Sequence, residues 1–169
     1  MASDDGLQGV EAVTTGVVIV DHGSRRAASN EMLERFVARF AEQHATAYPI
    51  VEPAHMELAE PSIATAFDRC VQRGAARIAV CPYFLAPGKH WHQDIPNLAR
   101  EAALQHPHVS YAVTAPIGLS PMIQDVIASQ LGYCLGQIDG ARDECEWCQG
   151  TGRCAMRHAD ETEPVVFHE

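Results

Sequence analysis

The sequence predicts an α/β domain built on a four-stranded parallel sheet with helices on both faces. Short apolar runs rich in β-branched residues alternate with longer segments whose apolar residues recur about every 3.6 positions. Aromatic residues make up only 7% of the chain, and glycine and proline recur between the segments, as is typical of this class. We expect this lobe at residues 15–135, after a flexible leader at 1–14 and before a cysteine-containing tail at 136–169.

The first half of the lobe is predicted to hold two strands and one helix. Residues 15–20 form an apolar run typical of a buried parallel strand, and a turn follows at 21–24. Residues 30–43 carry apolar side chains at helical spacing, which predicts an amphipathic helix. A second strand is expected at 50–58, and Pro53 places it at a sheet edge or a bulge, because proline cannot donate to the ladder.

The second half continues the alternation of helices and strands. Pro61 suits the first turn of a helix, and Gly74 suits its end. Pro96 delays or interrupts the helix in which it lies. The expected elements are a helix from 60–62 to 74, a strand at 76–82, a helix at 91–105, a strand at 109–113 and a helix at 121–135.

Charge and hydropathy exclude several classes of partner. The formal net charge is −10 and no basic stripe is present, which argues against nucleic acid and against an anionic membrane surface. No run approaches the roughly 20 apolar residues of a membrane span. The first 14 residues contain neither Lys nor Arg nor an apolar core, so we expect no secretory signal.

Polar side chains follow three of the predicted strands. His22 comes after the first strand, Glu57 ends the second, and His90 follows the third, with Asp94 close behind. Sites in parallel sheets form beyond the carboxyl ends of strands, so these side chains should meet at one edge. Two imidazoles and a carboxylate suit Fe²⁺, Co²⁺, Ni²⁺ or Zn²⁺, and without a metal they suit proton abstraction. A lone histidine after a strand is more often a cap, but two at equivalent positions favour a site.

Three ordered motifs carry a family resemblance. They are D-H-G-S at 21–24, E-L-A-E-P-S-I at 57–63 and P-Y-F-L-A-P-G-K-H at 82–90, followed by D-I-P at 94–96. They resemble the class II tetrapyrrole chelatases, in the short single-lobe form of the sirohydrochlorin chelatases of the CbiX/SirB type. The resemblance implies insertion of Fe²⁺ into sirohydrochlorin to make sirohaem, with Co²⁺ insertion for cobalamin as the alternative. It also implies a homodimer, because one short chain supplies half of the two-lobed chelatase fold.

The same resemblance assigns roles to individual residues. It makes His22 and His90 the metal-contacting and proton-accepting pair, and it gives Glu57 a supporting role. The substrate carries several carboxylates, so positive and hydrogen-bonding groups should meet them. We expect Ser24, Arg25, Arg26 and Lys89 to bind these substrate carboxylates. The two arginines also suit a solvated helix start.

The tail contains a second motif, C-x2-C-x-G-x-G-x-C at 145–154. Its thiolates, Cys145, Cys148 and Cys154, suit Zn²⁺ or an iron–sulfur cluster. The motif resembles the C-terminal extension of plant-type sirohydrochlorin ferrochelatases, which implies an iron–sulfur cluster. Our hypothesis is that the tail reports iron or redox status, because it lies outside the catalytic lobe and binds the metal that the enzyme would insert. A fourth ligand is missing, and Cys134 is the leading candidate, with a cysteine of a second subunit or His158 as alternatives. A flexible tail without metal is the remaining alternative.

Two broader alternatives concern activity and location. The chain would be a non-catalytic metal carrier or tetrapyrrole-binding protein if the histidines bound without turnover. We expect the plastid stroma if the source is a photosynthetic eukaryote, and the cytoplasm otherwise.

Overall fold

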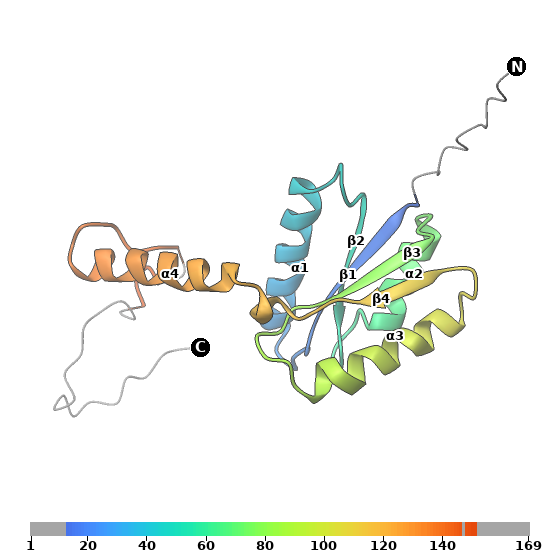
Figure 1. Ribbon diagram of the computed structural model, residues 1–169. Coiled ribbons are helices and arrows are strands. Elements are labelled where there is room, and N and C mark those ends of the chain that lie inside the picture. Colours follow the sequence, from blue (N-terminus) through green and yellow to red (C-terminus); the bar gives the residue numbers. More distant parts are fainter. Residues whose placement is uncertain (1–12, 147, 152–169) are drawn as a thin grey trace, which may run out of the picture. The chain divides into compact units, whose positions relative to one another are not determined.

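The computed structural model describes residues 13–146 and 148–151, and a parallel four-stranded sheet forms its centre (Figure 1). The strand order is β2-β1-β3-β4, and every neighbouring pair is parallel. The strands are β1 (Thr15–Asp21), β2 (Ile50–His55), β3 (Arg77–Pro82) and β4 (Ser110–Val113). The predicted fold class is therefore confirmed, and so is the edge position of the strand that contains Pro53.

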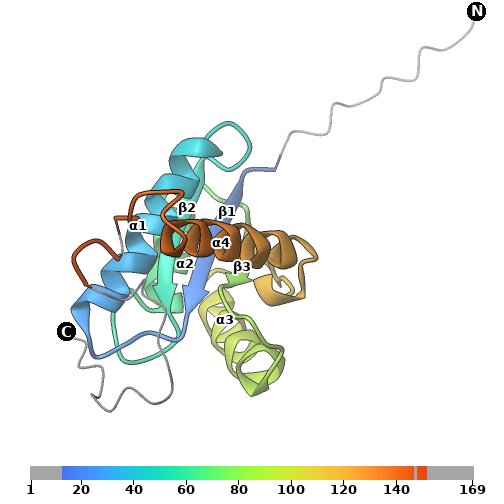
Figure 2. The ribbon, with the colours of Figure 1, turned by 90° about the vertical axis from the view of Figure 1, so that its left-hand side faces the viewer.

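Helices occupy both faces of this sheet, as predicted (Figures 1 and 2). On one face, α1 (Ala27–Gln43) packs Leu33 and Val37 against β1 and β2. On the other face, α2 (Ile63–Gln72) and α3 (Ile95–Leu104) enclose the larger core, in which Phe67 and Ile78 are fully buried. Burial of each such side chain contributes roughly 1.5–3 kcal/mol. Just beyond the strand ends, His22, Glu57 and His90 remain partly exposed.

Two element boundaries differ from the prediction for identifiable reasons. The helix α1 begins at Ala27 instead of 30, and Asn30 in its first turn bonds backward to the preceding loop. The strand β2 ends at His55 instead of 58, because His55 N–H donates to Pro61 O and pairs there with the returning chain. Leu58, inside that return, has a φ of 69°.

Residues 83–94 lead from the third strand into a wide helical turn. The π-helical turn η1 (His90–Asp94) runs directly into α3, and Pro96 lies at the start of α3 as predicted. A short 3-10 turn, η2 (Ile117–Leu119), follows β4. Its Gly118 N–H donates to Phe84 O at 3.0 Å, which fixes the loop that precedes η1.

The chain divides into two compact units between Ser120 and Pro121. The second unit contains α4 (Met122–Ile138), which ends at Ile138 where the prediction gave 135, followed by turns. The apolar face of α4 is at least half exposed at Met122, Val126, Ile127, Leu131 and Leu135.

In the described ranges, no helix has the length and hydropathy that crossing a bilayer requires. Most of the expected leader, and residues 152–169 of the expected tail, lie outside the described residues.

Candidate active site

The three predicted catalytic side chains come together at the carboxyl edge of the sheet. His22 Nε2 lies 3.0 Å from Glu57 Oε1. The rings of His22 and His90 meet edge to face, with their centroids 5.2 Å apart and their planes at 75°. The side chains of His22, Glu57 and His90 are 44%, 53% and 41% exposed, respectively, so a ligand can reach all three from solvent.

The turn after β1 presents His22. Gly23 has a φ of +85°, which is accessible to glycine, and its N–H donates to Asp21 Oδ1 at 2.9 Å. Asn30 binds both backbone groups of Ser24, accepting from its N–H and donating to its C=O at 2.9 Å each. Asn30 was not predicted to have a role, and the D-H-G-S motif contains no signal for these two hydrogen bonds.

The backbone also couples His22 directly to Glu57. Met56 N–H donates to Asp21 O at 2.9 Å, and Glu57 N–H donates to His22 O at 3.1 Å. These bonds directly follow the last pair of the β1–β2 ladder, so the main chain sets the spacing between the imidazole and the carboxylate. A side chain at Gly23 would place its Cβ 2.0 Å from Glu57 O, which shows how closely the two segments approach.

A carboxylate orients His90 from within the same helical turn. His90 Nδ1 lies 2.8 Å from Asp94 Oδ2, and the wide turn is closed by Ile95 N–H donating to His90 O. Single π-helical turns recur at functional sites. Trp91 Nε1 donates to Thr114 O at 2.9 Å, which ties η1 to the end of β4. Asp94 was expected near this edge but was not predicted to orient His90, although its i, i+4 spacing from His90 is a signal for that contact.

These contacts define the proton positions. An ionised carboxylate only accepts, so the proton of His90 lies on Nδ1 and the lone pair on Nε2 is available to a metal or a proton. His22 Nε2 faces Glu57 Oε1 at 3.0 Å, and its Nδ1 lies 3.2 Å from Gly23 O. In the neutral tautomer with the proton on Nε2, this N–H donates to the Glu57 carboxylate. An incoming cation at either atom would displace this proton.

A surface pocket of about 460 Å³ opens beside these groups. This volume is within the usual range for small-molecule sites. The charged groups in its lining are the carboxylates of Glu57 and Asp94 and the ammonium group of Lys89. Lys89 Nζ lies 3.9 Å from Asp94 Oδ1. The lining residues are Met56, Glu57, Lys89, His90, Asp94, Asn97 and Leu98.

Protein ligands alone do not complete a metal cage at this edge. Within 13–146 and 148–151, no three or more His, Cys, Asp or Glu side chains are arranged to hold an ion. A cation held by His22 or His90 would therefore take further ligands from water or from a bound molecule.

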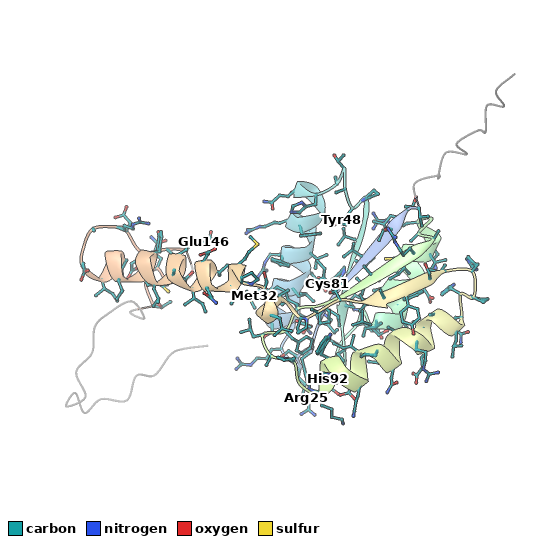
Figure 3. The ribbon with its side chains drawn as sticks, viewed as in Figure 1. Arg25, Met32, Tyr48, Cys81, His92 and Glu146 are labelled. Atoms are coloured by element: carbon teal, nitrogen blue, oxygen red, sulfur yellow. The ribbon has the colours of Figure 1, made fainter. Side chains whose placement is uncertain are left out.

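The four predicted substrate-binding residues do not share one position. Lys89 lines the pocket, whereas Ser24, Arg25 and Arg26 lie in the loop before α1 and are not part of its lining. Ser24 Oγ accepts the N–H of Arg26 at 3.1 Å. Figure 3 shows Arg25 and His92 on the side of the sheet at which the strands end.

The described part of the tail shows a compact turn around two of its cysteines. Cys145 O accepts the N–H groups of Cys148 and Gln149, each at 3.0 Å. Cys134 lies on α4, where Gln130 Nε2 contacts its Sγ at 3.3 Å. Cys134, Cys145 and Cys148 form no three-ligand group. Cys154 and the alternative ligand His158 lie outside the described residues, so the predicted four-cysteine set stays a prediction.

Known proteins resemble this chain over the region that contains the site. A curated relative named "Sirohydrochlorin ferrochelatase, chloroplastic" from Arabidopsis thaliana is 54% identical over 141 residues, which are 83% of this chain and 62% of that protein. A CbiX protein of cobalamin biosynthesis from Marinobacter aquaeolei is 29% identical with a TM-score of 0.63, over 74% of this chain and 98% of that one. SirB from Bacillus subtilis with Fe³⁺ is 28% identical with a TM-score of 0.62, over 74% of this chain and 47% of that one.

The lengths of these matches decide what they show. The chain spans less than two thirds of the length of the first curated relatives that it matches. The family model described as CbiX matches residues 16–133, which contain all four strands except Thr15 of β1, and every side chain at the strand edge. Because that match extends over well more than half of the sequence, this chain belongs to the CbiX family.

Proposed function

We propose that this protein inserts Fe²⁺ into sirohydrochlorin to form sirohaem. The observation that carries the proposal is the edge-to-face approach of His22 and His90, with Glu57 in contact with His22. The name of the Arabidopsis relative supports both the macrocycle and the metal. Metal and macrocycle are both substrates in this reaction.

The geometry supports a division of labour between the two histidines. To accept a metal, the macrocycle must lose two pyrrolic N–H protons, and the ion must shed water. His90 Nε2, directed by Asp94, is suited to hold the ion at one face of the macrocycle. His22 and Glu57 contact solvent, so they can accept macrocycle protons one at a time and release each to water before the next. His22 also becomes a metal ligand once its Nε2 is deprotonated.

The charges around the pocket fit two oppositely charged substrates. Glu57 and Asp94 raise the local concentration of a divalent cation. The same acids repel the carboxylates of sirohydrochlorin, so those carboxylates are expected near Lys89 and the exposed Arg25 and Arg26. The expected consequence is that the macrocycle binds with its acidic periphery toward the start of α1.

Insertion of Co²⁺ is the second candidate. The Marinobacter relative is named for cobalamin biosynthesis, and imidazole and carboxylate ligands do not select between the two metals. Anaerobic assays with each metal decide this point: loss of the metal-free absorption spectrum is expected for both, with the larger kcat/KM for Fe²⁺. If the protein accelerated neither reaction above the uncatalysed rate, it would be a metal or tetrapyrrole binder instead.

We also propose that the protein acts as a homodimer. About half of the SirB chain aligns with this one, so a second copy would supply the other half of a two-lobed site. The exposed apolar face of α4 is a surface that such a copy would cover.

We propose further that the tail holds an iron–sulfur cluster. Cys145, Cys148, Cys154 and Cys134 would hold it, and the turn at Cys145 and the thiol donor set fit this chemistry. Such a cluster would supply one-electron redox chemistry, and so a response to redox or iron status. Analysis of iron and acid-labile sulfide in anaerobically purified protein tests it. Deletion of residues 140–169 without effect on redox response, activity or dimer stability would exclude a regulatory role.

The location follows from the source. The Arabidopsis relative is named chloroplastic, which supports the plastid stroma for a photosynthetic eukaryote. Fractionation of plastids with an antibody to this protein tests that assignment.

A further inference from the structure

A buried histidine–aspartate pair lies directly behind the strand-edge site. Asp21 and His55 are register partners at the last position of the β1–β2 ladder, and His55 Nδ1 lies 2.7 Å from Asp21 Oδ1. The side chain of His55 has no exposed surface, whereas that of Asp21 is 25% exposed. None of the chemical steps proposed above uses either residue.

The contacts of Asp21 reach both segments that carry reactive groups. Its Oδ1 accepts the N–H of Gly23 at 2.9 Å as well as the proton of His55 Nδ1. One oxygen therefore joins the end of β2 to the turn that presents His22. That turn rests against the backbone of Glu57, because a Cβ at Gly23 would meet Glu57 O at 2.0 Å. The pair thus ties the two backbone segments on which His22 and Glu57 stand.

Packing alone does not explain a histidine at position 55. Burial of a polar ring without full hydrogen bonding is unfavourable. His55 Nε2 is buried and has no hydrogen-bond partner in the part of the chain that the structure describes. An apolar ring would fill the same space without this penalty. What the imidazole adds is the bond to Asp21.

We propose that Asp21 and His55 are positioning residues that hold the His22 turn against Glu57, so that both groups face an incoming divalent cation. Neither residue contacts the cation. This inference rests on the proposed function, because it concerns the same site. It predicts that loss of the pair weakens metal binding and raises the KM for the metal without unfolding the protein.

The fold contains a second histidine–aspartate pair that serves as a matched control. His106 Nε2 lies 2.6 Å from Asp68 Oδ1, and the His106 ring stacks on Phe67 with centroids 5.8 Å apart. Neither residue of this pair lines the pocket. Both H55F and H106F remove a hydrogen bond between a histidine and an aspartate. His55 lies behind the site, whereas His106 lies away from it.

The experiment measures Co²⁺ affinity by its visible absorption, together with thermal unfolding, for wild type, H55F and H106F. We expect both variants to unfold at similar temperatures, and H55F to bind Co²⁺ about 10- to 100-fold more weakly, as is usual when a supporting group behind a metal site is lost. We expect H106F to bind like wild type. The inference would be overturned if folded H55F bound Co²⁺ as tightly as wild type, or if H106F lost as much Co²⁺ affinity as H55F.

Two further variants separate positioning from folding. Asp21→Asn keeps an oxygen that accepts from both Gly23 and His55, so it should bind Co²⁺ close to wild type. Asp21→Ala removes both contacts and should bind as weakly as H55F. If H55F does not fold, the two Asp21 variants test the inference instead. Equal Co²⁺ affinities of Asp21→Asn and Asp21→Ala would overturn it. Wild type that binds Co²⁺ but does not metallate sirohydrochlorin would instead disprove only the proposed function.

Discussion

His22 and His90 face each other across the edge of the sheet, with ring centroids 5.2 Å apart, although they follow different strands. The register of β1 and β3 brings them together. Val20 pairs with Pro82, and Tyr83 N–H extends this ladder by donating to Val20 O at 2.7 Å. The main chain therefore fixes the start of both loops, and η1 returns His90 toward His22. The proposed chemistry depends on this convergence.

Removal of the carboxylate that orients His90 should weaken the site without unfolding the protein. Asp94→Ala loses the 2.8 Å bond to His90 Nδ1, so the ring no longer has a fixed tautomer or orientation. We expect metal affinity to fall by about 10- to 100-fold. A Co²⁺ titration measures this, with Asp68→Ala as the control because Asp68 binds a histidine away from the pocket. Wild-type affinity in Asp94→Ala would show that His90 needs no such support.

The exposed face of α4 should control the oligomeric state. Val126 and Leu131 are 60% and 56% exposed, and burial of each at a subunit interface would contribute roughly 1.5–3 kcal/mol. We expect the double variant Val126→Glu/Leu131→Glu to shift the protein from dimer to monomer in light scattering. Leu104→Glu, at a leucine of α3 that is 65% exposed, should leave the dimer intact. A wild type that is monomeric at micromolar concentration would contradict the dimer proposal.

The start of α2 should show a pH-dependent contribution to stability. The N–H of Ser62, and then the hydroxyl of Thr65, hold the pKa of Glu60 below its usual 4.5. A lowered pKa means that the charged form stabilises the fold above pH 4.5, and that this contribution is lost as the pH falls through the folded-state value.

Thermal unfolding of Glu60→Gln tests this assignment. The variant should unfold at a lower temperature than wild type at pH 7, and the gap should close as the pH is lowered below 4.5. A gap that does not change with pH would mean that the carboxylate charge makes no contribution there.

Cys70 should be chemically inert in the native protein. Desolvation, and then the nearby Glu52 carboxylate, raise the pKa of its thiol from 9.0 to about 12. Alkylation with iodoacetamide at pH 8 should therefore leave Cys70 unmodified unless denaturant is present, as peptide mass spectrometry would show. Since the raised pKa favours the folded state only while the thiol is protonated, stability should also fall as the pH rises from 9.0 towards 12. Rapid native labelling of Cys70 would contradict its burial.

The sequence predicted those features that depend on local periodicity. Alternating strand and helix patterns gave the sheet, both helical layers and the edge position of β2, because Pro53 cannot serve an interior ladder. The positions of polar residues at or just after strand ends then predicted that His22, Glu57 and His90 meet at one edge, which they do. The carboxyl ends of parallel strands leave few other arrangements.

Individual side-chain hydrogen bonds were not predictable in this way. The Asn30 amide holds Ser24 in the preceding loop, and Asp21 joins the distant His55 to Gly23, yet neither contact leaves a periodic signal. The early end of β2 depends on a bond from His55 to Pro61 in a segment that reads as continuous strand. Such features follow from tertiary packing, which overrides local preference.

The most direct test of this account is the anaerobic rate of Fe²⁺ insertion into sirohydrochlorin by wild type, His22→Ala, His90→Ala and the double variant, with His106→Ala as control. If the two imidazoles act as one unit, each single variant should lose roughly 100-fold or more in kcat/KM, and the double variant should lose little beyond the slower single variant. Rates close to wild type in either single variant, with the protein folded, would contradict the assignment of metal insertion to this pair.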